Sequence, residues 1–349
     1  MDKYEHGGNI YVYNEDVIDF SSNINPLGFP ECIRDSIDIA VLTKYPDINY
    51  TQLKRSISRY VGLKNENIIV GNGASELIYL FVRAFSLKKP LIPSPAFLEY
   101  ERAVTLSGGN PLYYEISEED GYVIDANKIV NRFKEVDSVI IGNPNNPTGK
   151  GIKRKDVEYI VKEAKNLDLP VMIDEAFIEF IYDYEEYQSL DLINDYDNLF
   201  VVRAATKFFG LPGLRLGYGF GSENLIKRLE DYKEPWTVNA FADAVGRRIF
   251  DDVKFMGNTR KYIKKEIDYL MNELKKIDEL VVFDTQVNFM LLKLKHQSVN
   301  DLKEELLKRG ILIRDASNFR YLDNRYFRVA VKSHDDNVKL IEAIKEVFK

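Results

Sequence analysis

The sequence has few of the residues that build disulfide frameworks and metal centres. It contains one cysteine, Cys32, and three histidines among 349 residues. One cysteine cannot form an internal disulfide, and no residues near it have the spacing of metal ligands. We therefore expect no metal in the functional site, and we interpret Cys32 as a small buried apolar residue.

Long apolar runs and an excess of positive charge are also absent. No uninterrupted apolar stretch approaches the roughly 20 residues of a membrane span, and the start of the chain lacks the apolar core of a targeting segment. Lys and Arg number 48 against 55 Asp and Glu, a formal net charge of −7. This balance argues against a nucleic-acid surface. We expect a cytoplasmic protein with neither a membrane nor a nucleic-acid partner.

Short apolar runs alternate with helical patterns over the first 250 residues. A strand over 67–70 leads into a helix over 75–85, and an amphipathic helix covers 154–166. Further strands are expected near 91–92, 112–116, 139–141, 171–173, 199–202 and 214–220. This alternation predicts an α/β fold with a mostly parallel sheet covered by helices.

The pattern changes near residue 251, where a long charged helix begins and reaches about residue 277. Runs typical of strands follow at 280–283, 289–293, 311–314 and 327–331, with helices between them, which predicts a smaller α+β C-terminal domain. We expect three parts: an N-terminal arm (1–30) that packs on the small domain, a large domain (31–250) and the small domain (251–349).

One lysine and one arginine lie on a glycine-punctuated turn between two apolar runs, as Lys207 and Arg215. A lysine in a partly desolvated pocket loses basicity and can condense with a carbonyl, and a nearby guanidinium offers a planar fork to a phosphate. The pair suits pyridoxal phosphate. The alternative is a solvated surface lysine beside an arginine that only packs or forms an ion pair.

Two companion motifs follow predicted strands. Asn143-Pro-Asn-Asn146-Pro-Thr-Gly149 is a string of turn formers after an apolar run. Asp174 ends the run 171–173, at the strand end where open α/β sheets bind ligands. An acid there could hold the proton of a pyridinium nitrogen. Taken singly it is more often a solvated helix cap, but its order with Lys207 favours the cofactor interpretation.

The order of these motifs resembles the fold-type I aminotransferase superfamily over nearly the whole chain. The matching segments are Gly71-Asn-Gly-Ala-Ser75, Pro95-Ala-Phe97, Asn143 to Gly149, Asp174 to Phe177, Thr206-Lys207 and Arg215. Two branches compete, the histidinol-phosphate aminotransferases and the threonine-phosphate decarboxylases of cobalamin biosynthesis. The chain is more similar to the decarboxylases in His6 to Asn9, Asp19 to Gly28, Pro235 to Asn239 and Ile311 to Phe319. Phe177, where the aminotransferases usually have tyrosine, favours the same branch.

The resemblance implies a set of residues for the cofactor. Lys207 would be the lysine that condenses with its aldehyde. The other cofactor-binding positions are Ala74, Ser75, Phe97, Asn146, Asp174, Phe177, Thr206, Arg215 and Tyr45. Tyr45 would cross the interface of a homodimer to the other subunit's cofactor phosphate. Without the resemblance, Ser75 would be interpreted as a helix cap and Phe97 as core.

The resemblance also implies substrate contacts at His6, Gly7, Asn23, Asn146, Arg314 and Arg328. A phosphorylated amino acid carries nearly three negative charges, which favours guanidinium partners. Arg328 would bind the carboxylate and Arg314 the phosphate, although an arginine on a strand is usually a surface ion pair. One position departs from the family: Ala204 stands where a serine or threonine usually donates to the cofactor phosphate.

The expected activity is decarboxylation of L-threonine O-3-phosphate to (R)-1-aminopropan-2-yl phosphate. Histidinol-phosphate transamination and decarboxylation of serine O-phosphate are alternatives within the superfamily, as is a non-catalytic cofactor-binding regulator. A dinucleotide-binding oxidoreductase is a weaker alternative, because Glu76 replaces the third glycine of its fingerprint.

Overall fold

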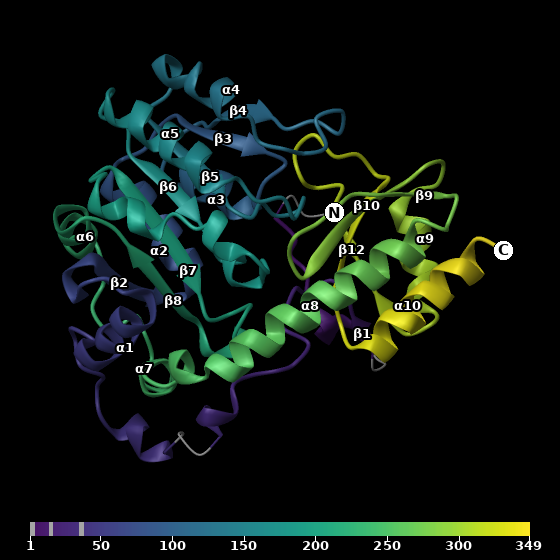
Figure 1. Cartoon of the computed structure of the whole chain (residues 1–349), viewed down its shortest axis with the longest axis horizontal. Helices are drawn as coiled ribbons and strands as arrows, with labels where there is room; N and C mark the ends of the chain where they lie inside the picture. Colours follow the sequence, from purple (N-terminus) through teal and green to yellow (C-terminus); the bar gives the residue numbers. More distant parts are fainter. Residues whose placement is uncertain (1–3, 14–16, 35–37) are drawn as a thin grey trace.

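A seven-stranded sheet forms the centre of the larger part of the molecule, in a computed structural model that describes residues 4–13, 17–34 and 38–349. Its order is β2-β8-β7-β6-β5-β3-β4 (Figure 1). The strands are β2 (Ile68–Asn72), β3 (Pro90–Ser94), β4 (Leu112–Glu115), β5 (Ser138–Gly142), β6 (Val171–Asp174), β7 (Leu199–Ala204) and β8 (Leu216–Phe220). β8 runs antiparallel to both of its neighbours, β2 and β7, and the other pairs in this sheet are parallel. The predicted mostly parallel α/β sheet is confirmed.

Helices cover both faces of this sheet. They are α1 (Thr51–Val61), α2 (Gly73–Ala84), α3 (Leu98–Leu106), α4 (Ala126–Val130), α5 (Arg154–Lys165), α6 (Glu223–Glu230) and α7 (Ala240–Gly246). Val139 and Ile141 of β5 join the core cluster that includes α5, whereas Ile140 joins the cluster of α2, α3 and α6. Successive side chains of a strand point to opposite faces, so a strand covered on both sides is apolar throughout.

The turn between β2 and α2 brings Gly73 against Arg215. Helix α2 begins at Gly73, two residues earlier than predicted, and its N-cap is Asn72. The amide of Gly73 donates to the carbonyl of Arg215 over 3.0 Å. A Cβ atom on Gly73 would lie 2.5 Å from Nη2 of Arg215, and the φ of +73° is one that glycine tolerates best. The glycine thus lets the guanidinium approach the helix N-terminus.

A smaller antiparallel sheet lies beside the large one, to its right in Figure 1. Its order is β12-β13-β10-β9. The strands are β9 (Leu280–Val282), β10 (Phe289–Leu294), β12 (Arg314–Asp315) and β13 (Tyr326–Ala330), and the helices of this part are α8 (Val253–Leu274), α9 (Val299–Leu307) and α10 (His334–Val347). The expected smaller α+β part is therefore present.

The N-terminal segment pairs with this smaller part. β1 (Ile18–Asp19) runs parallel to β11 (Ile311–Leu312). Helix α8 extends from beside α7 toward α9 (Figure 1), and its Arg260 donates to the carbonyl of Glu179 in the larger part. Because α8 contacts both parts, the domain limits at residues 30 and 250 stay predictions, and residues 1–3, 14–16 and 35–37 of those segments lie outside the described residues.

The composition predicted no membrane-spanning segment and a buried Cys32. In the described ranges no helix is long and apolar enough to cross a membrane. Cys32 is partly buried rather than fully buried, and its thiol donates to the carbonyl of Arg248 at 3.4 Å. The cytoplasmic location stays a prediction.

Candidate active site

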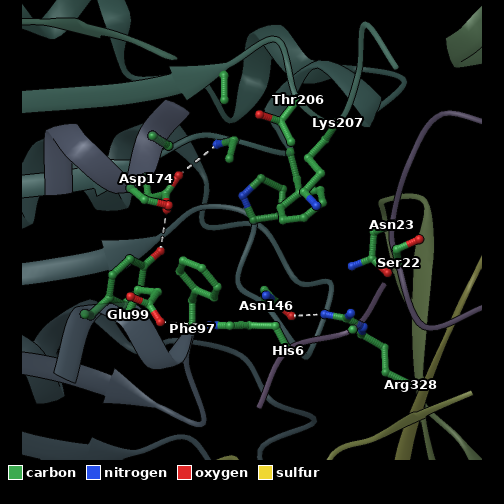
Figure 2. Close-up of a pocket in the computed structure, with 18 of the residues that line it drawn as sticks. His6, Ser22, Asn23, Phe97, Glu99, Asn146, Asp174, Thr206, Lys207 and Arg328 are labelled. Atoms are coloured by element: carbon green, nitrogen blue, oxygen red, sulfur yellow. Dashed lines mark hydrogen bonds and ion pairs between the residues drawn. The ribbon is translucent and has the colours of Figure 1, made fainter. Parts of the chain in front are cut away.

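A cavity of about 430 Å³ opens where the parallel strands of the large sheet end. Asp174 is the last residue of β6, and Thr206 and Lys207 follow β7. Arg328 reaches the cavity from β13 of the small sheet, and His6, Ser22 and Asn23 reach it from the N-terminal segment (Figure 2). The cavity is lined by His6, Gly7, Ser21, Ser22, Asn23, Ala74, Ser75, Phe97, Glu99, Tyr100, Arg102, Pro144, Asn146, Asp174, Ala176, Phe177, Ala204, Thr206, Lys207, Arg215 and Arg328.

Most residues proposed from the sequence meet at this cavity, and two do not. Tyr45 is 81% exposed and stacks at a tilt on Trp236, with ring centroids 4.9 Å apart. Arg314 is buried away from the cavity wall. The structure thus brings the remaining candidates together, while the role of each one stays a prediction.

Lys207 lies at the cavity wall in a cationic neighbourhood. Burial, followed by the charges of Arg328, Arg215 and Lys332, lowers the pKa of its ammonium to about 8. Its carbonyl accepts a hydrogen bond from the amide of Asn25 at 3.1 Å. The backbone of the lysine is therefore held in place, and its amine is neutral, as a nucleophile requires, more often near neutral pH than that of an ordinary lysine.

Asp174 is a buried carboxylate whose two oxygens have different donors. The hydroxyl of Tyr100 donates to Oδ2 at 2.8 Å, and the amide of Ala176 donates to Oδ1 at 3.0 Å. Burial outweighs both bonds and raises the pKa of Asp174 to about 6. A cation or a shared proton at this carboxylate would offset the desolvation.

A fully buried ion pair joins the two strands that carry these residues. Nη2 of Arg203, on β7, lies 2.7 Å from Oε2 of Glu175, which directly follows Asp174. Oε1 of Glu175 accepts hydrogen bonds from both the amide and the hydroxyl of Ser189. Removing one partner of such a pair typically costs about 3–5 kcal/mol, because the other charge is left buried and unpaired. This pair fixes the ends of β6 and β7 relative to each other.

The N-terminus of α2, Thr206 and Arg215 all line the cavity, and the guanidinium of Arg215 lies against Gly73, the first residue of α2. Arg215 has no ion-pair partner among the residues that the structure describes. The helix has no side-chain cap, so Ser75 does not serve as the N-cap. Backbone amides at a helix N-terminus, the positive end of the helix dipole and a guanidinium are groups that can hold a phosphate, and that role for them stays a prediction.

Arg328 faces the opposite side of the cavity with an unused donor. Nη1 donates to Oδ1 of Asn146 (Figure 2) and Nη2 to the carbonyl of Ser21, whereas the buried Nε has no hydrogen-bond partner in the part of the chain that the structure describes. The buried Oδ1 of Asn23 also lacks one. Burial and the charge of Arg314 lower the pKa of Arg328. A desolvated guanidinium with no carboxylate at ion-pair distance among the described residues is a site for an anionic ligand.

Arg314 holds the N-terminal segment. Its Nη2 donates to the carbonyl of Glu5 at 2.6 Å and to Oδ1 of Asn318 at 2.8 Å. Glu5 directly precedes His6, so this arginine supports the segment that forms one wall of the cavity. A direct contact of Arg314 with a substrate phosphate stays a prediction.

Several cavity residues escaped the sequence interpretation: Ser21, Ser22, Glu99, Tyr100, Arg102, Pro144 and Ala176. Tyr100 and Glu99 come directly after the Pro95-Ala-Phe97 motif, and Ser21 and Ser22 lie inside the segment from Asp19 to Gly28. Their nearness to those motifs was a usable signal. What each of them contacts depends on chain segments far away in the sequence.

Comparison with known proteins agrees with this geometry. The family model described as "Aminotransferase class I and II" matches residues 15–344. The chain belongs to this family. It is 59% identical to a protein named "Putative threonine-phosphate decarboxylase" from Caldanaerobacter subterraneus subsp. tengcongensis, over 100% of this chain and 95% of that protein.

Two further relatives represent the two branches. The threonine-phosphate decarboxylase of Salmonella typhimurium is 31% identical, over 98% of this chain and 96% of its own length. The crystal structure of the histidinol-phosphate aminotransferase from Clostridium acetobutylicum superposes with a TM-score of 0.89 at 38% identity, covering 94% of this chain and 98% of that one. The fold-type I architecture is confirmed.

The cofactor of this family is pyridoxal phosphate, and the cavity fits it. Lys207 offers an amine of lowered pKa, Asp174 a buried acid for a ring nitrogen, and Arg215 with the N-terminus of α2 a place for a phosphate. Phe177 is buried and packs edge-on against Phe289, with ring centroids 5.0 Å apart. It offers no hydroxyl to the cofactor.

Proposed function

We propose that this enzyme decarboxylates L-threonine O-3-phosphate to (R)-1-aminopropan-2-yl phosphate and carbon dioxide, as a step of cobalamin biosynthesis. The observation that carries the proposal is the buried guanidinium of Arg328, which lines the same cavity as Lys207. Its Nε has no hydrogen-bond partner among the described residues. It supplies a site for an amino-acid carboxylate beside the reactive lysine. The 59% identical relative supports the choice of decarboxylation.

Substrate binding follows from the charges of the cavity. Arg328 would take the carboxylate in a paired, charge-assisted contact, with Asn146 and the carbonyl of Ser21 fixing the guanidinium plane. Because those two contacts come from different parts of the chain, the guanidinium has little freedom to follow a misplaced ligand. Because the carboxylate is held in one place, the orientation of the bound substrate determines which bond at Cα breaks.

The residues divide the chemistry between them. Pyridoxal phosphate, when bound, supplies the electron sink for the pair left when the bond from Cα to the carboxylate breaks. Asp174 holds a positive charge at the ring nitrogen, and its buried setting strengthens that interaction. The ammonium form of Lys207 would give a proton to Cα, so that carbon dioxide and the amine product account for all atoms of the substrate carboxylate plus one proton.

Amino transfer is the second candidate, and a specific observation favours it. A histidinol-phosphate aminotransferase superposes with a TM-score of 0.89. The same lysine would then remove a proton from Cα rather than return one. Decarboxylation of serine O-phosphate is a narrower alternative, because one methyl group changes discrimination by only about 1–3 kcal/mol.

Two parallel assays separate these reactions. One measures carbon dioxide from phosphothreonine and from phosphoserine without any keto acid. The other measures amino transfer from histidinol phosphate to 2-oxoglutarate. We expect carbon dioxide release, fastest with phosphothreonine, and no transfer; transfer without carbon dioxide would leave the aminotransferase as the function.

We further infer that the enzyme acts as a homodimer in which Tyr45 reaches the other subunit's cofactor phosphate. Tyr45, Ile39 and Leu42 are exposed aromatic or aliphatic residues of one segment, beside the exposed Trp236. Such a cluster of apolar side chains is typical of a contact surface. Sedimentation should give a dimer, and Tyr45→Phe should weaken cofactor binding without dissociating it. A monomer with full cofactor affinity would contradict this.

A further inference from the structure

Glu99 is a buried carboxylate on the cavity wall that the proposed reaction does not use. It lies in the first turn of α3 and is 7% exposed. Its Oε1 lies 2.8 Å from Nε2 of His6 and 3.4 Å from Nη1 of Arg102, and its Oε2 accepts a hydrogen bond of 2.6 Å from the hydroxyl of Tyr79. Figure 2 shows Glu99 and His6 side by side below Phe97.

The carboxylate is held in its charged form by these partners. Burial alone would raise the pKa of Glu99, but hydrogen bonds from His6 and Tyr79, with the charges of His6 and Arg102, outweigh it and lower the pKa to about 2. A fixed negative charge on the wall would repel a phosphorylated substrate if it stood alone. Its two oxygens, however, are turned toward their donors, and two of those donors belong to side chains that can carry positive charge.

We propose that Glu99 is a positioning residue that holds His6 and Arg102 at the cavity wall as a cationic subsite for the phosphate of a phosphorylated amino acid. The inference rests on the proposed function, because it names the part of the site that would select a phosphorylated substrate. The guanidinium of Arg102 and the imidazole of His6 are nitrogen donors of the kind that bind a phosphate monoester.

The geometry supports this subsite in two ways. The bond from Nε2 to Glu99 fixes the orientation of the imidazole, whose ring lies 5.7 Å from that of Phe97 at the cavity wall. All three residues line the cavity, where the side chains of His6 and Arg102 are each 43% exposed and that of Glu99 is 9% exposed. The two basic side chains are therefore more accessible to an incoming anion than the acid that pairs with them.

Contacts of Glu99 and Arg314 also hold the N-terminal segment in place. Arg314 binds the carbonyl of Glu5 from one side, and Glu99 binds the ring of His6 from the other. Glu99 and His6 are 93 residues apart in the sequence, so this contact closes the segment over α3. A purely structural role would make Glu99 an anchor for the segment and nothing more.

Four variants of the cofactor-loaded enzyme distinguish these roles: Glu99→Gln, His6→Ala, the double variant, and Glu101→Gln as the control. Glu101 lies on the same helix but pairs with Arg320 at 3.3 Å and does not line the cavity. Equilibrium binding of O-phosphothreonine, of threonine and of inorganic phosphate is measured for each one in the Lys207→Ala background, which should bind phosphothreonine without turning it over. Because binding is measured directly, the result does not depend on which reaction follows.

The subsite predicts that preference for phosphothreonine over threonine falls about tenfold or more in Glu99→Gln and in His6→Ala, since a hydrogen bond to a charged group is lost. The double variant should lose at least as much as His6→Ala, because Glu99 also positions Arg102, but less than the sum of the two single losses, because Glu99 acts partly through His6. Inorganic phosphate should bind more weakly in the same variants, threonine should bind as before, and Glu101→Gln should keep the full preference.

Two results would overturn the subsite. One is an unchanged preference in Glu99→Gln and His6→Ala. The other is an equal weakening of phosphothreonine and threonine, which is what a simple anchor for the N-terminal segment produces. If the wild type prefers phosphothreonine through these residues but releases no carbon dioxide from it, the subsite stands and the proposed decarboxylation fails.

Discussion

The hydroxyl of Tyr100 donates a hydrogen bond of 2.8 Å to Oδ2 of Asp174, joining the first turn of α3 to the end of β6. Together with the amide of Ala176, it occupies both carboxylate oxygens. The carboxyl is nevertheless easier to protonate than usual, because burial outweighs both bonds. In the enzyme without cofactor, Asp174 should therefore make the fold depend on pH.

The sign of that dependence follows from the two pKa values. In the folded state burial raises the pKa of Asp174 to about 6, from its ordinary value of 3.8. Between these values the folded state binds more protons than the unfolded state, so its stability falls as pH rises from about 4 to about 6. Asp174→Asn cannot titrate. Its stability relative to the wild type should rise on the order of 3 kcal/mol over this range.

Urea unfolding of both apoproteins at several pH values from 4 to 7 measures this difference. Lost hydrogen bonds in the variant would shift its stability at every pH, so only the change with pH counts. A difference that is constant over the range would show that Asp174 is not destabilised by burial.

Lys207→Ala should remove the covalent attachment of the cofactor and leave the fold intact. The substitution deletes an ammonium that burial already disfavours, so no stabilising pair is broken. The measurements are the yellow colour of the loaded enzyme, trapping with borohydride, and thermal unfolding. Cofactor that is still trapped on this variant would mean that another lysine is the reactive one.

Ala204→Ser should tighten cofactor binding. Ala204 is 2% exposed, ends β7 and lines the cavity near Thr206. A hydroxyl there could donate to the cofactor phosphate, and a hydrogen bond to a charged group contributes about 1.5–3 kcal/mol. The cofactor dissociation constant should fall about tenfold or more. An unchanged constant would indicate that Thr206 and Ser75 already satisfy the phosphate.

Arg314→Ala should remove most of the preference for phosphothreonine over threonine. Its guanidinium donates to Glu5 and Asn318, and its loss would release the segment that carries His6. Arg314→Lys is the matched control, because it keeps the charge but cannot make both contacts in one plane. An equal loss of the preference in both variants would show that the hydrogen bonds of Arg314 to Glu5 and Asn318 cause it. Loss in the alanine variant alone would assign it to the charge, and retention in both would exclude Arg314 from substrate selection.

The parts of the fold set by local periodicity could be predicted from the sequence. The apolar run from Val139 to Ile141 reads as a buried strand because both of its faces are covered, and Asp174 and Lys207 follow such strands directly. These strand ends meet at one edge of a parallel sheet. For this reason the order of the motifs along the chain was enough to predict most residues of the candidate site.

The remaining features depend on contacts between distant segments. The buried pair of Glu175 and Arg203 has no local signature, since charged residues usually indicate an exposed surface. The contact of Glu99 with His6 joins α3 to the N-terminal segment across 93 residues. Arg314 matched a motif, but its burial behind Glu5 is a consequence of tertiary packing.

The most direct test of the account is a turnover with phosphothreonine labelled in its carboxyl carbon, using cofactor-loaded enzyme and no keto acid. We predict that one labelled carbon dioxide is released for each aminopropanol phosphate formed, over many turnovers. Lys207→Ala should release none. If the label stays in a keto acid, or if reaction stops after one turnover until a keto acid is added, the enzyme transfers amino groups and the decarboxylase account is wrong.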